Sequence, residues 1–372
     1  MTEKIRYCCP CHFGLESVLA FEIKKIGGEN LLVSDGRISF NGDIKMLAKA
    51  NICLASAERV LIELGTFEAR SFEELFQGVK ALEAERYIGK KDAFPVKGHS
   101  LKSALHSIPD CQSIIKKALV ERLKPVYGVN RFEESGAVVQ VRFNILKDVV
   151  SIYLDTSGQG LHKRGYRRTS NDAPIKETLA AGIIDLAHVR GDSVVCDPMC
   201  GSGTLIIEAA YKALRIAPGL KRSFAAQSWE SIPSEIWDET RLDAREQIAK
   251  DNTFTGYASD IDSFAVDLTQ KNVKYAGVAN RITVSKKDIS EYKPKAGVIT
   301  VCNPPYGERM FELRQAQELY KKMGQVLCPS KSNPYYIICA DEEFEKFFGK
   351  KADKKRKLYN GMLKCQLYMY YM

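Results

Sequence analysis

Four strand-like segments in the second half of the chain, among them the apolar run 298–302, each lead to a polar residue, and stretches with helical periodicity separate them. Apolar runs of this kind are typical of strands buried in a parallel sheet, with a helix crossing between successive strands. The polar residues are Asp197, Asp260, Asp288 and Asn303. Because parallel strands carry their carboxyl ends at one edge, where open α/β sheets bind ligands, the four are expected to meet there. The pattern predicts an α/β domain with a site at this edge.

The run at 298–302 is followed by Asn303-Pro304-Pro305-Tyr306. The two prolines lack a backbone donor and fix φ, so the loop presents acceptors, namely the Asn303 side-chain oxygen and the Pro304 carbonyl. Two converging acceptors suit an amino group on a flat ring, since accepting both protons leaves the nitrogen lone pair nucleophilic. Tyr306 can then stack on the ring. The alternative is that Asn-Pro-Pro is only a stiff turn after a strand.

The first run leads into a tight glycine turn and the start of a helix, at residues 197–204. Gly201 and Gly203 let the backbone come close to a ligand. The third glycine of the dinucleotide-binding fingerprint is absent. Asp197 would accept from a cationic amino group but would repel a pyrophosphate. S-adenosylmethionine therefore fits this turn better than NAD does.

The two middle runs each supply one further carboxylate. Asp260, at the end of its strand, can accept from both ribose hydroxyls of an adenosine moiety. Asp262 is instead expected to cap the helix that follows. Asp288 is placed to bind the adenine amino group. Four strand ends of this kind in succession are a far more specific signal for such a site than any one of them.

These segments together resemble the bacterial 23S rRNA guanine-N2 methyltransferases that carry an N-terminal THUMP domain. Residues 10–22, 153–167 and 173–180 also resemble that family, so the resemblance covers essentially the whole chain. It implies a Rossmann-like class I S-adenosylmethionine-dependent methyltransferase domain at 159–372. An α+β ferredoxin-like module at 1–62 and a THUMP RNA-binding domain at 63–158 would precede it. Some members carry a second methyltransferase domain, and this chain ends at Met372.

The resemblance also implies the reaction and its residues. S-adenosylmethionine would give its methyl to the exocyclic N2 of a flipped guanine in 23S rRNA or a large-subunit precursor, leaving S-adenosylhomocysteine. It points to guanine 2445. No metal is implied. The catalytic residues would be Asn303, Pro304, Pro305 and Tyr306, and the cofactor-binding residues Asp197, Pro198, Cys200, Gly201, Ser202, Gly203, Thr204, Asp260, Ile261, Asp288 and Ile289.

Three alternatives stay open. The enzyme could act on tRNA guanine-N2, or on adenine-N6 of DNA, because the Asn-Pro-Pro-Tyr chemistry serves any exocyclic amine. The α+β first half, which resembles an RNA-binding module, weighs against DNA. The third alternative is a catalytically silent RNA-binding protein.

The net charge of +9 is concentrated in two clusters that predict phosphate binding. Lys163, Arg164, Arg167 and Arg168 come within six residues and are predicted to contact RNA at the domain junction. Alternatively, parts of this cluster pair with acids of the first helix or are structural. The second cluster, 350–357, is a phosphate site or a solvated face.

The remaining signals concern location and packing. No apolar run approaches ~18 residues, so no transmembrane helix is expected. The start of the chain lacks a signal-peptide core, and eleven cysteines, some within apparent strands, indicate reduced thiols and the cytoplasm. Residues 217–252 are expected to be an insertion beside the site or holding substrate, or to pack Trp229 and Trp237 into a core. A closing strand at 363–371 is expected to pair antiparallel.

Overall fold

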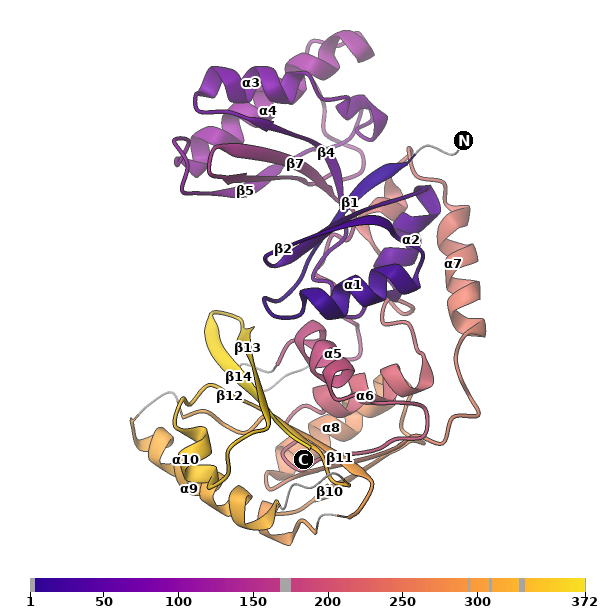
Figure 1. Ribbon diagram of the computed structural model, residues 1–372. Helices are drawn as coiled ribbons and strands as arrows, with labels where there is room; N and C mark the ends of the chain where they lie inside the picture. Colours follow the sequence, from indigo (N-terminus) through magenta and orange to yellow (C-terminus); the bar gives the residue numbers. More distant parts are fainter. Residues whose placement is uncertain (1–3, 168–174, 294, 308–309, 328–331, 372) are drawn as a thin grey trace.

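The computed structural model describes residues 4–167, 175–293, 295–307, 310–327 and 332–371. They form two seven-stranded sheets, one in each half of the chain. Figure 1 shows these sheets at opposite ends of an elongated molecule. Of the helices in the described ranges, none combines the length and apolar content that a membrane crossing needs.

A single sheet, in the order β2-β3-β1-β4-β7-β6-β5, runs through both modules of the first half. Strand β4 links them, because it pairs with β1 through Leu61 and Ile62 and with β7 along its whole length. The predicted α+β character is confirmed. Its elements are β1 (Ile5–Pro10), α1 (Glu16–Lys25), β2 (Glu29–Ser34), β3 (Arg37–Gly42), α2 (Ile44–Cys53), β4 (Leu61–Glu68), α3 (Phe72–Lys80), η1 (Ala84–Arg86), β5 (Val96–Leu101), α4 (Ile108–Tyr127), β6 (Val141–Leu146) and β7 (Val149–Asp155).

The second sheet has the order β10-β9-β8-β11-β12-β14-β13. The pairs among β10, β9, β8, β11 and β12 are parallel, as the apolar runs predicted. The last strand pairs antiparallel with β12, which confirms the expected closing strand. Its elements are α5 (Glu177–Leu186), β8 (Val194–Asp197), α6 (Thr204–Leu214), η2 (Ala225–Ser228), α7 (Glu235–Glu246), β9 (Thr255–Asp260), α8 (Ser263–Ala276), β10 (Ile282–Lys286), η3 (Ile289–Glu291), β11 (Val298–Cys302), α9 (Met310–Val326), β12 (Tyr335–Cys339), α10 (Phe344–Phe348), β13 (Lys354–Asn360) and β14 (Leu363–Tyr370).

The insertion at 217–252 leaves the second half and packs on the first. Trp229 and Trp237 are both 2% exposed and belong to the core beneath the first sheet. The Trp229 Nε1 donates to the Val138 carbonyl at 3.1 Å. Helix α7 lies beside α2, as Figure 1 shows. Core packing of the tryptophans is therefore confirmed, and the expectation that the insertion lies beside the site is wrong.

Candidate active site

The glycine turn between β8 and α6 is held from below by helix α8. Gly201 and Gly203 adopt φ of +53° and +78°, the left-handed region that glycine enters without strain. The Thr269 hydroxyl donates to the Gly201 carbonyl at 2.8 Å, and the Asn272 amide donates to the Ser202 carbonyl at 2.9 Å. A Cβ added to Gly203 would lie 2.8 Å from the Thr269 methyl. The turn is therefore a fixed, backbone-lined cradle.

Two carboxylates stand at the ends of neighbouring strands. Asp197 is 1% exposed and its Oδ1 accepts from the Met199 backbone N–H at 3.3 Å. Burial, aided by the nearby Asp260 charge, raises the pKa of Asp197 to about 8. Asp260 accepts from the Gly201 N–H at 2.9 Å and from the Asp262 N–H at 3.0 Å. Asp260 thus fastens the glycine turn to β9 while its carboxylate faces the same space as Asp197.

The acids predicted beyond β9 and β10 both cap helices. Asp262 accepts from the Phe264 N–H at 2.9 Å, which confirms its role as the cap of α8. Asp288 accepts from the N–H and the hydroxyl of Ser290, at 2.8 and 2.6 Å, at the start of η3. These hydrogen bonds lower the pKa of Asp288. Asp288 therefore presents an ionised carboxylate at the edge of the site.

The Asn303-Pro304-Pro305-Tyr306 loop follows β11. This strand lies beside β8, on the side opposite β9. The Tyr306 hydroxyl donates to the Asn303 Oδ1, and the Tyr320 hydroxyl donates to the Pro305 carbonyl at 2.8 Å. An amide oxygen has two lone pairs, so Asn303 can accept a further hydrogen bond. Tyr306 is half-buried between two apolar clusters, and burial raises its pKa. The loop is therefore well packed, and the Tyr306 hydroxyl orients the Asn303 side-chain oxygen.

These segments enclose a cavity of about 420 Å³ at the carboxyl edge of the sheet. Each predicted catalytic or cofactor-binding residue except Gly203 lines it. Sequence reasoning missed the turn-holding Thr269 and Asn272, although polar residues three apart on the apolar side of α8 were a usable signal. It also missed the remaining lining residues, Ile175, Met199, Leu205, Lys287 and Leu319.

A larger cavity, of about 870 Å³, lies elsewhere, between α1 and α2 of the first half and the far end of α6. It contains none of the four strand ends that the sequence singled out, although Lys25, Lys49 and Arg215 line it. Chemistry, and not size, therefore assigns the site to the smaller cavity.

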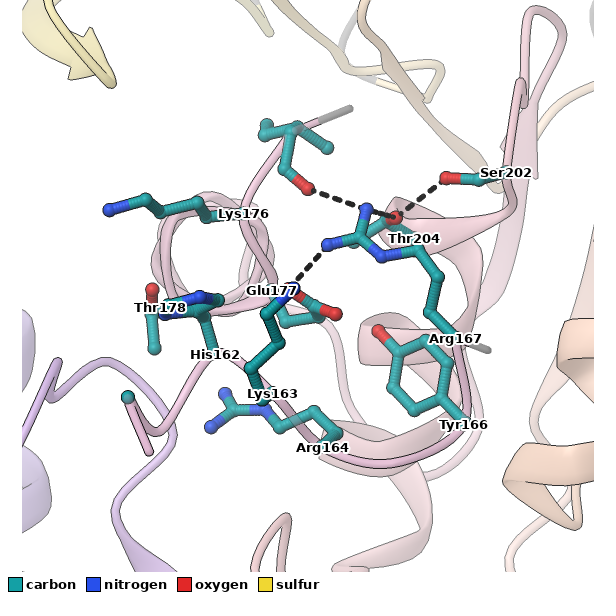
Figure 2. A network of polar contacts seen from close by, with 12 residues as sticks. His162, Lys163, Arg164, Tyr166, Arg167, Lys176, Glu177, Thr178, Ser202 and Thr204 are labelled. Atoms are coloured by element: carbon teal, nitrogen blue, oxygen red, sulfur yellow. Dashed lines mark hydrogen bonds and ion pairs between the residues drawn. The ribbon is translucent and has the colours of Figure 1, made fainter. Parts of the chain in front are cut away.

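Two arginines of the basic cluster at the junction, Arg164 and Arg167, are engaged by other parts of the protein, and Figure 2 shows them among their neighbours. The Arg164 guanidinium donates to the Ala55 carbonyl and, at 2.8 Å, to the Leu161 carbonyl, and it lies 3.5 Å from Glu208. Both side chains of that ion pair are 2% exposed. Burial favours neutral forms, but the Glu208 carboxylate holds the pKa of Arg164 above its usual range. The prediction that Arg164 contacts RNA is wrong.

Arg167 is likewise engaged within the second half. It pairs with Glu177 at 2.7 Å and lies 3.4 Å from the Thr204 hydroxyl, which faces Ser202 at 3.1 Å (Figure 2). With 9% of its side chain exposed, Arg167 braces the glycine turn, and its predicted RNA contact is also wrong. The alternative that parts of this cluster are structural is correct for Arg167, whose partner Glu177 is the first residue of α5. Lys163 is exposed and stays a candidate, and Arg168 lies outside the described residues.

The residues that line this cavity fit S-adenosylmethionine. The turn offers close backbone approach, the buried Asp197 has a hydrogen-bonding capacity that a cationic amino group would use, and Asp260 and Asp288 follow at successive strand ends. The cavity also reaches the Asn303 loop, so a donor and an acceptor group can share it.

Comparison with known proteins agrees with this geometry. Residues 164–369 match the family model described as "RMKL-like, methyltransferase domain", residues 6–61 the RlmL ferredoxin-like domain and residues 69–155 the THUMP domain. A Bacillus subtilis (strain 168) protein named "Putative RNA methyltransferase YpsC" is 42% identical over 362 residues, covering 96% of this chain and 94% of that protein.

A Psychromonas ingrahamii protein named "Ribosomal RNA large subunit methyltransferase K/L" is 32% identical over 381 residues, covering 98% of this chain. The chain spans only 50% of that relative's length.

Two solved structures share the whole architecture. The structure of SMU.472 complexed with SAH has a TM-score of 0.93 and 38% identity, covering 100% of this chain and 99% of that one. A Listeria monocytogenes structure titled as a predicted N6-adenine-specific DNA methylase also has a TM-score of 0.93 and 38% identity, covering 99% and 96% of the two chains. The chain therefore belongs to the RMKL-like methyltransferase family, whose cofactor is S-adenosylmethionine, with a ferredoxin-like and a THUMP domain ahead of the methyltransferase domain.

Proposed function

We propose that the protein methylates the exocyclic N2 of a guanine in 23S rRNA. The observation that carries this proposal is the placement of Asn303 and Pro304 in the same cavity as the cofactor-binding turn. Two acceptors on a proline-stiffened loop match the two protons of an exocyclic amino group. Guanine 2445 is the position to which the family resemblance points.

On the donor side, the chain's own residues would bind and orient the cofactor, which supplies an activated methyl group. Asp197 would accept from its amino group, Asp260 from the ribose hydroxyls and Asp288 from the adenine amino group. Gly201 and Gly203 let the backbone approach. Most of the acceleration would then come from positioning, since the donor needs no further activation.

On the acceptor side, Asn303 would orient the guanine amino group. Its oxygen already accepts from the Tyr306 hydroxyl, which fixes the direction of the remaining lone pair. Tyr306 lines the cavity, and the part of its ring that stays exposed there would stack on the base. The base would reach this depth only when flipped out of the RNA.

The first half supports RNA over DNA as the substrate. Its single sheet joins the segments that match a ferredoxin-like and a THUMP domain, and the Bacillus subtilis relative named as a putative RNA methyltransferase aligns with 96% of the chain. We place the domain limits at 1–62, 63–158 and 159–372, with β4 as the shared strand. The Listeria monocytogenes protein, described as a predicted N6-adenine-specific DNA methylase, keeps DNA adenine-N6 as the competing substrate, with tRNA guanine-N2 behind it.

Transfer of a tritiated methyl group separates these readings. Ribosomal RNA from a strain lacking the gene, bulk tRNA and unmethylated DNA would be offered to the purified protein, and the labelled nucleoside mapped by mass spectrometry. We expect label in N2-methylguanosine of 23S rRNA. Label in N6-methyladenine of DNA, or in no substrate while S-adenosylhomocysteine still binds, would refute the proposal.

The raised pKa of Asp197 makes cofactor binding depend on pH. A carboxyl with a folded pKa of about 8 is mostly protonated at pH 6, and a cationic amino group binds its ionised form. We expect the affinity for S-adenosylhomocysteine to rise from pH 6 to 8, by up to about tenfold per pH unit. An α-amino group stays protonated until about pH 8, so it does not reverse the trend earlier. Calorimetry at several pH values would measure this.

The raised pKa of Asp197 has the opposite effect on the stability of the free protein, which falls as pH rises. Because the folded pKa lies above the unfolded value of about 4, the contribution of Asp197 to the stability of the free protein is lost as pH rises from about 4 through 8. Asp197→Asn should bind S-adenosylhomocysteine with an affinity that is flat over pH 6–8. A flat profile in the wild type would show that the amino group does not use Asp197.

A further inference from the structure

We propose that the turn of the β13–β14 hairpin and the loop at Phe13 form a binding surface for the single-stranded RNA that flanks the target nucleotide. This surface, called the hairpin surface here, consists of Phe13, Lys357, Tyr359 and Met362. The proposal rests on RNA being the substrate, and it adds where the strand lies outside the cavity.

The hairpin surface includes the end of the second basic cluster. Its later residues form β13, which pairs with β14 from Lys354–Met369 to Asn360–Leu363. Gly361, with φ of +65°, and Met362 make the connecting turn, and Met362 is 99% exposed. The hairpin therefore projects as an arm with an exposed apolar tip. Because β13 is a paired strand, it holds its charged side chains at fixed positions.

Strand register places this arm beside the active site. Cys302, at the end of β11, is level with Ile337 of β12, which is level with Tyr368 of β14. Asn303 is therefore about level with Leu367, and the turn lies five residues further on, roughly 16 Å beyond the sheet edge at ~3.3 Å per residue. The lower part of the arm touches the site, because the Cys365 thiol faces the Tyr306 hydroxyl. The arm thus rises from the catalytic tyrosine.

The arm is fastened to the first half of the chain, which completes the surface. The Arg356 Nη1 donates to the Gly14 carbonyl at 2.9 Å, across 342 residues of sequence. Next to this bond the Phe13 and Tyr359 rings meet edge to face, with centroids 6.0 Å apart. In Figure 1 the β13–β14 hairpin points toward the end of the first half that carries α1 and β2. The two domains therefore build one aromatic platform beside the arm.

Exposure shows that the platform does more than join the domains. Phe13 rests against the turn at Gly36, where an added Cβ would lie 3.1 Å from the ring, yet 53% of Phe13 stays exposed. A contact that served only to dock the two halves would bury that ring. An exposed aromatic face beside cations is the usual platform for stacking unpaired bases.

The charges divide into neutralised and available ones. Lys355 pairs with Glu345 at 2.7 Å and Lys364 with Glu342 at 2.8 Å, so both are compensated. Lys357 is exposed, and its ammonium lies 5.3 Å from the centroid of the Tyr359 ring. An ammonium beside a stacking ring can meet the phosphate of the nucleotide that stacks there.

Base flipping explains why the strand at this place would be unpaired. Extruding the target guanine unstacks its neighbours, and those nucleotides leave the cavity at the sheet edge where the arm stands. Stacking on Phe13 and Tyr359 would replace the contacts that these bases lose. The surface therefore fits single-stranded RNA better than a duplex, whose bases offer no free faces.

The test compares matched variants of the full-length protein binding a short fluorescein-labelled single-stranded RNA. Phe13→Ala should weaken binding about 5- to 100-fold, as expected for losing one stacked base. Lys357→Ala should lower the log–log salt slope by about 0.7. Phe21→Ala is the aromatic control, since Phe21 is 60% exposed on α1 of the same domain, and Lys355→Ala is the control for charge on the same strand. Both controls should bind like the wild type.

Affinity for S-adenosylhomocysteine should not change in any of these variants. If Phe13→Ala binds like Phe21→Ala, or if Lys357→Ala keeps the wild-type salt slope, the hairpin surface is refuted while RNA methylation stands. Equal affinity of the wild type for a duplex of the same sequence would refute the preference for single strands. Absence of RNA binding by the wild type would remove both proposals.

Discussion

Asn303→Ala is expected to lower the rate of methyl transfer by at least ~100-fold, the usual scale for removing one oriented polar group from a reacting centre. The reason is that its side-chain oxygen is assigned to the amino group in the transition state. Single-turnover measurements with saturating cofactor and rRNA would record the loss. Cofactor and RNA affinity should stay close to wild type.

The structure adds a cost to this substitution that is small beside the effect on rate. Without Asn303 the Tyr306 hydroxyl loses its acceptor, which costs about 1 kcal/mol of stability and should not unfold the protein. Tyr306→Phe removes the same hydrogen bond and keeps the ring, so it measures that part alone. Asn303→Asp keeps an acceptor oxygen and should lose less activity than Asn303→Ala. Turnover of Asn303→Ala within a few-fold of wild type would reduce the loop to a stiff turn.

Arg164→Ala is expected to destabilise the protein by about 3–5 kcal/mol, measured by urea unfolding. It would leave Glu208 buried without its cation and two backbone carbonyls, of Ala55 and Leu161, without a donor. Because Arg164 bridges the two halves of the chain, the first unfolding transition should show the loss.

Two further variants separate this structural role from RNA contact. The double variant Arg164→Met with Glu208→Leu should recover much of the lost stability, since an apolar pair can replace a buried ion pair. Lys163→Ala, at the exposed neighbour, should leave stability unchanged, and any RNA contact of this cluster would show there as a lower salt slope. Full stability of Arg164→Ala combined with a lower salt slope would restore the phosphate role of Arg164.

Local sequence patterns were sufficient to predict the catalytic half of the fold. An apolar run, a turn residue and a helix start each depend on a few neighbouring residues, so Asp197, Asp260 and Asn303 could be placed at strand ends. Parallel strands then bring those ends to one edge whatever the rest of the chain does. The capping role of Asp262 followed in the same way, because a cap is decided within three residues.

Contacts between distant segments were not predictable in this way. The insertion at 217–252 was recognisable by its length, but its docking on the first half depends on Trp229 reaching the Val138 carbonyl, 91 residues away in sequence. The basic cluster at 350–357 shows only charge in the sequence, and only the pairing with β14 revealed that its residues from Lys354 onward belong to a strand.

By itself the sequence determined the order of strands and turns in the catalytic half and the residue types at the site, because short-range periodicity and backbone preferences carry that information. Only the tertiary structure decided which charges face solvent. From the sequence, Arg164 was predicted to bind phosphate. In the fold it contacts Glu208, 44 residues later, and the Ala55 carbonyl, 109 residues earlier. The free energy of a charge depends on its burial and its partners, and both are set by the whole fold.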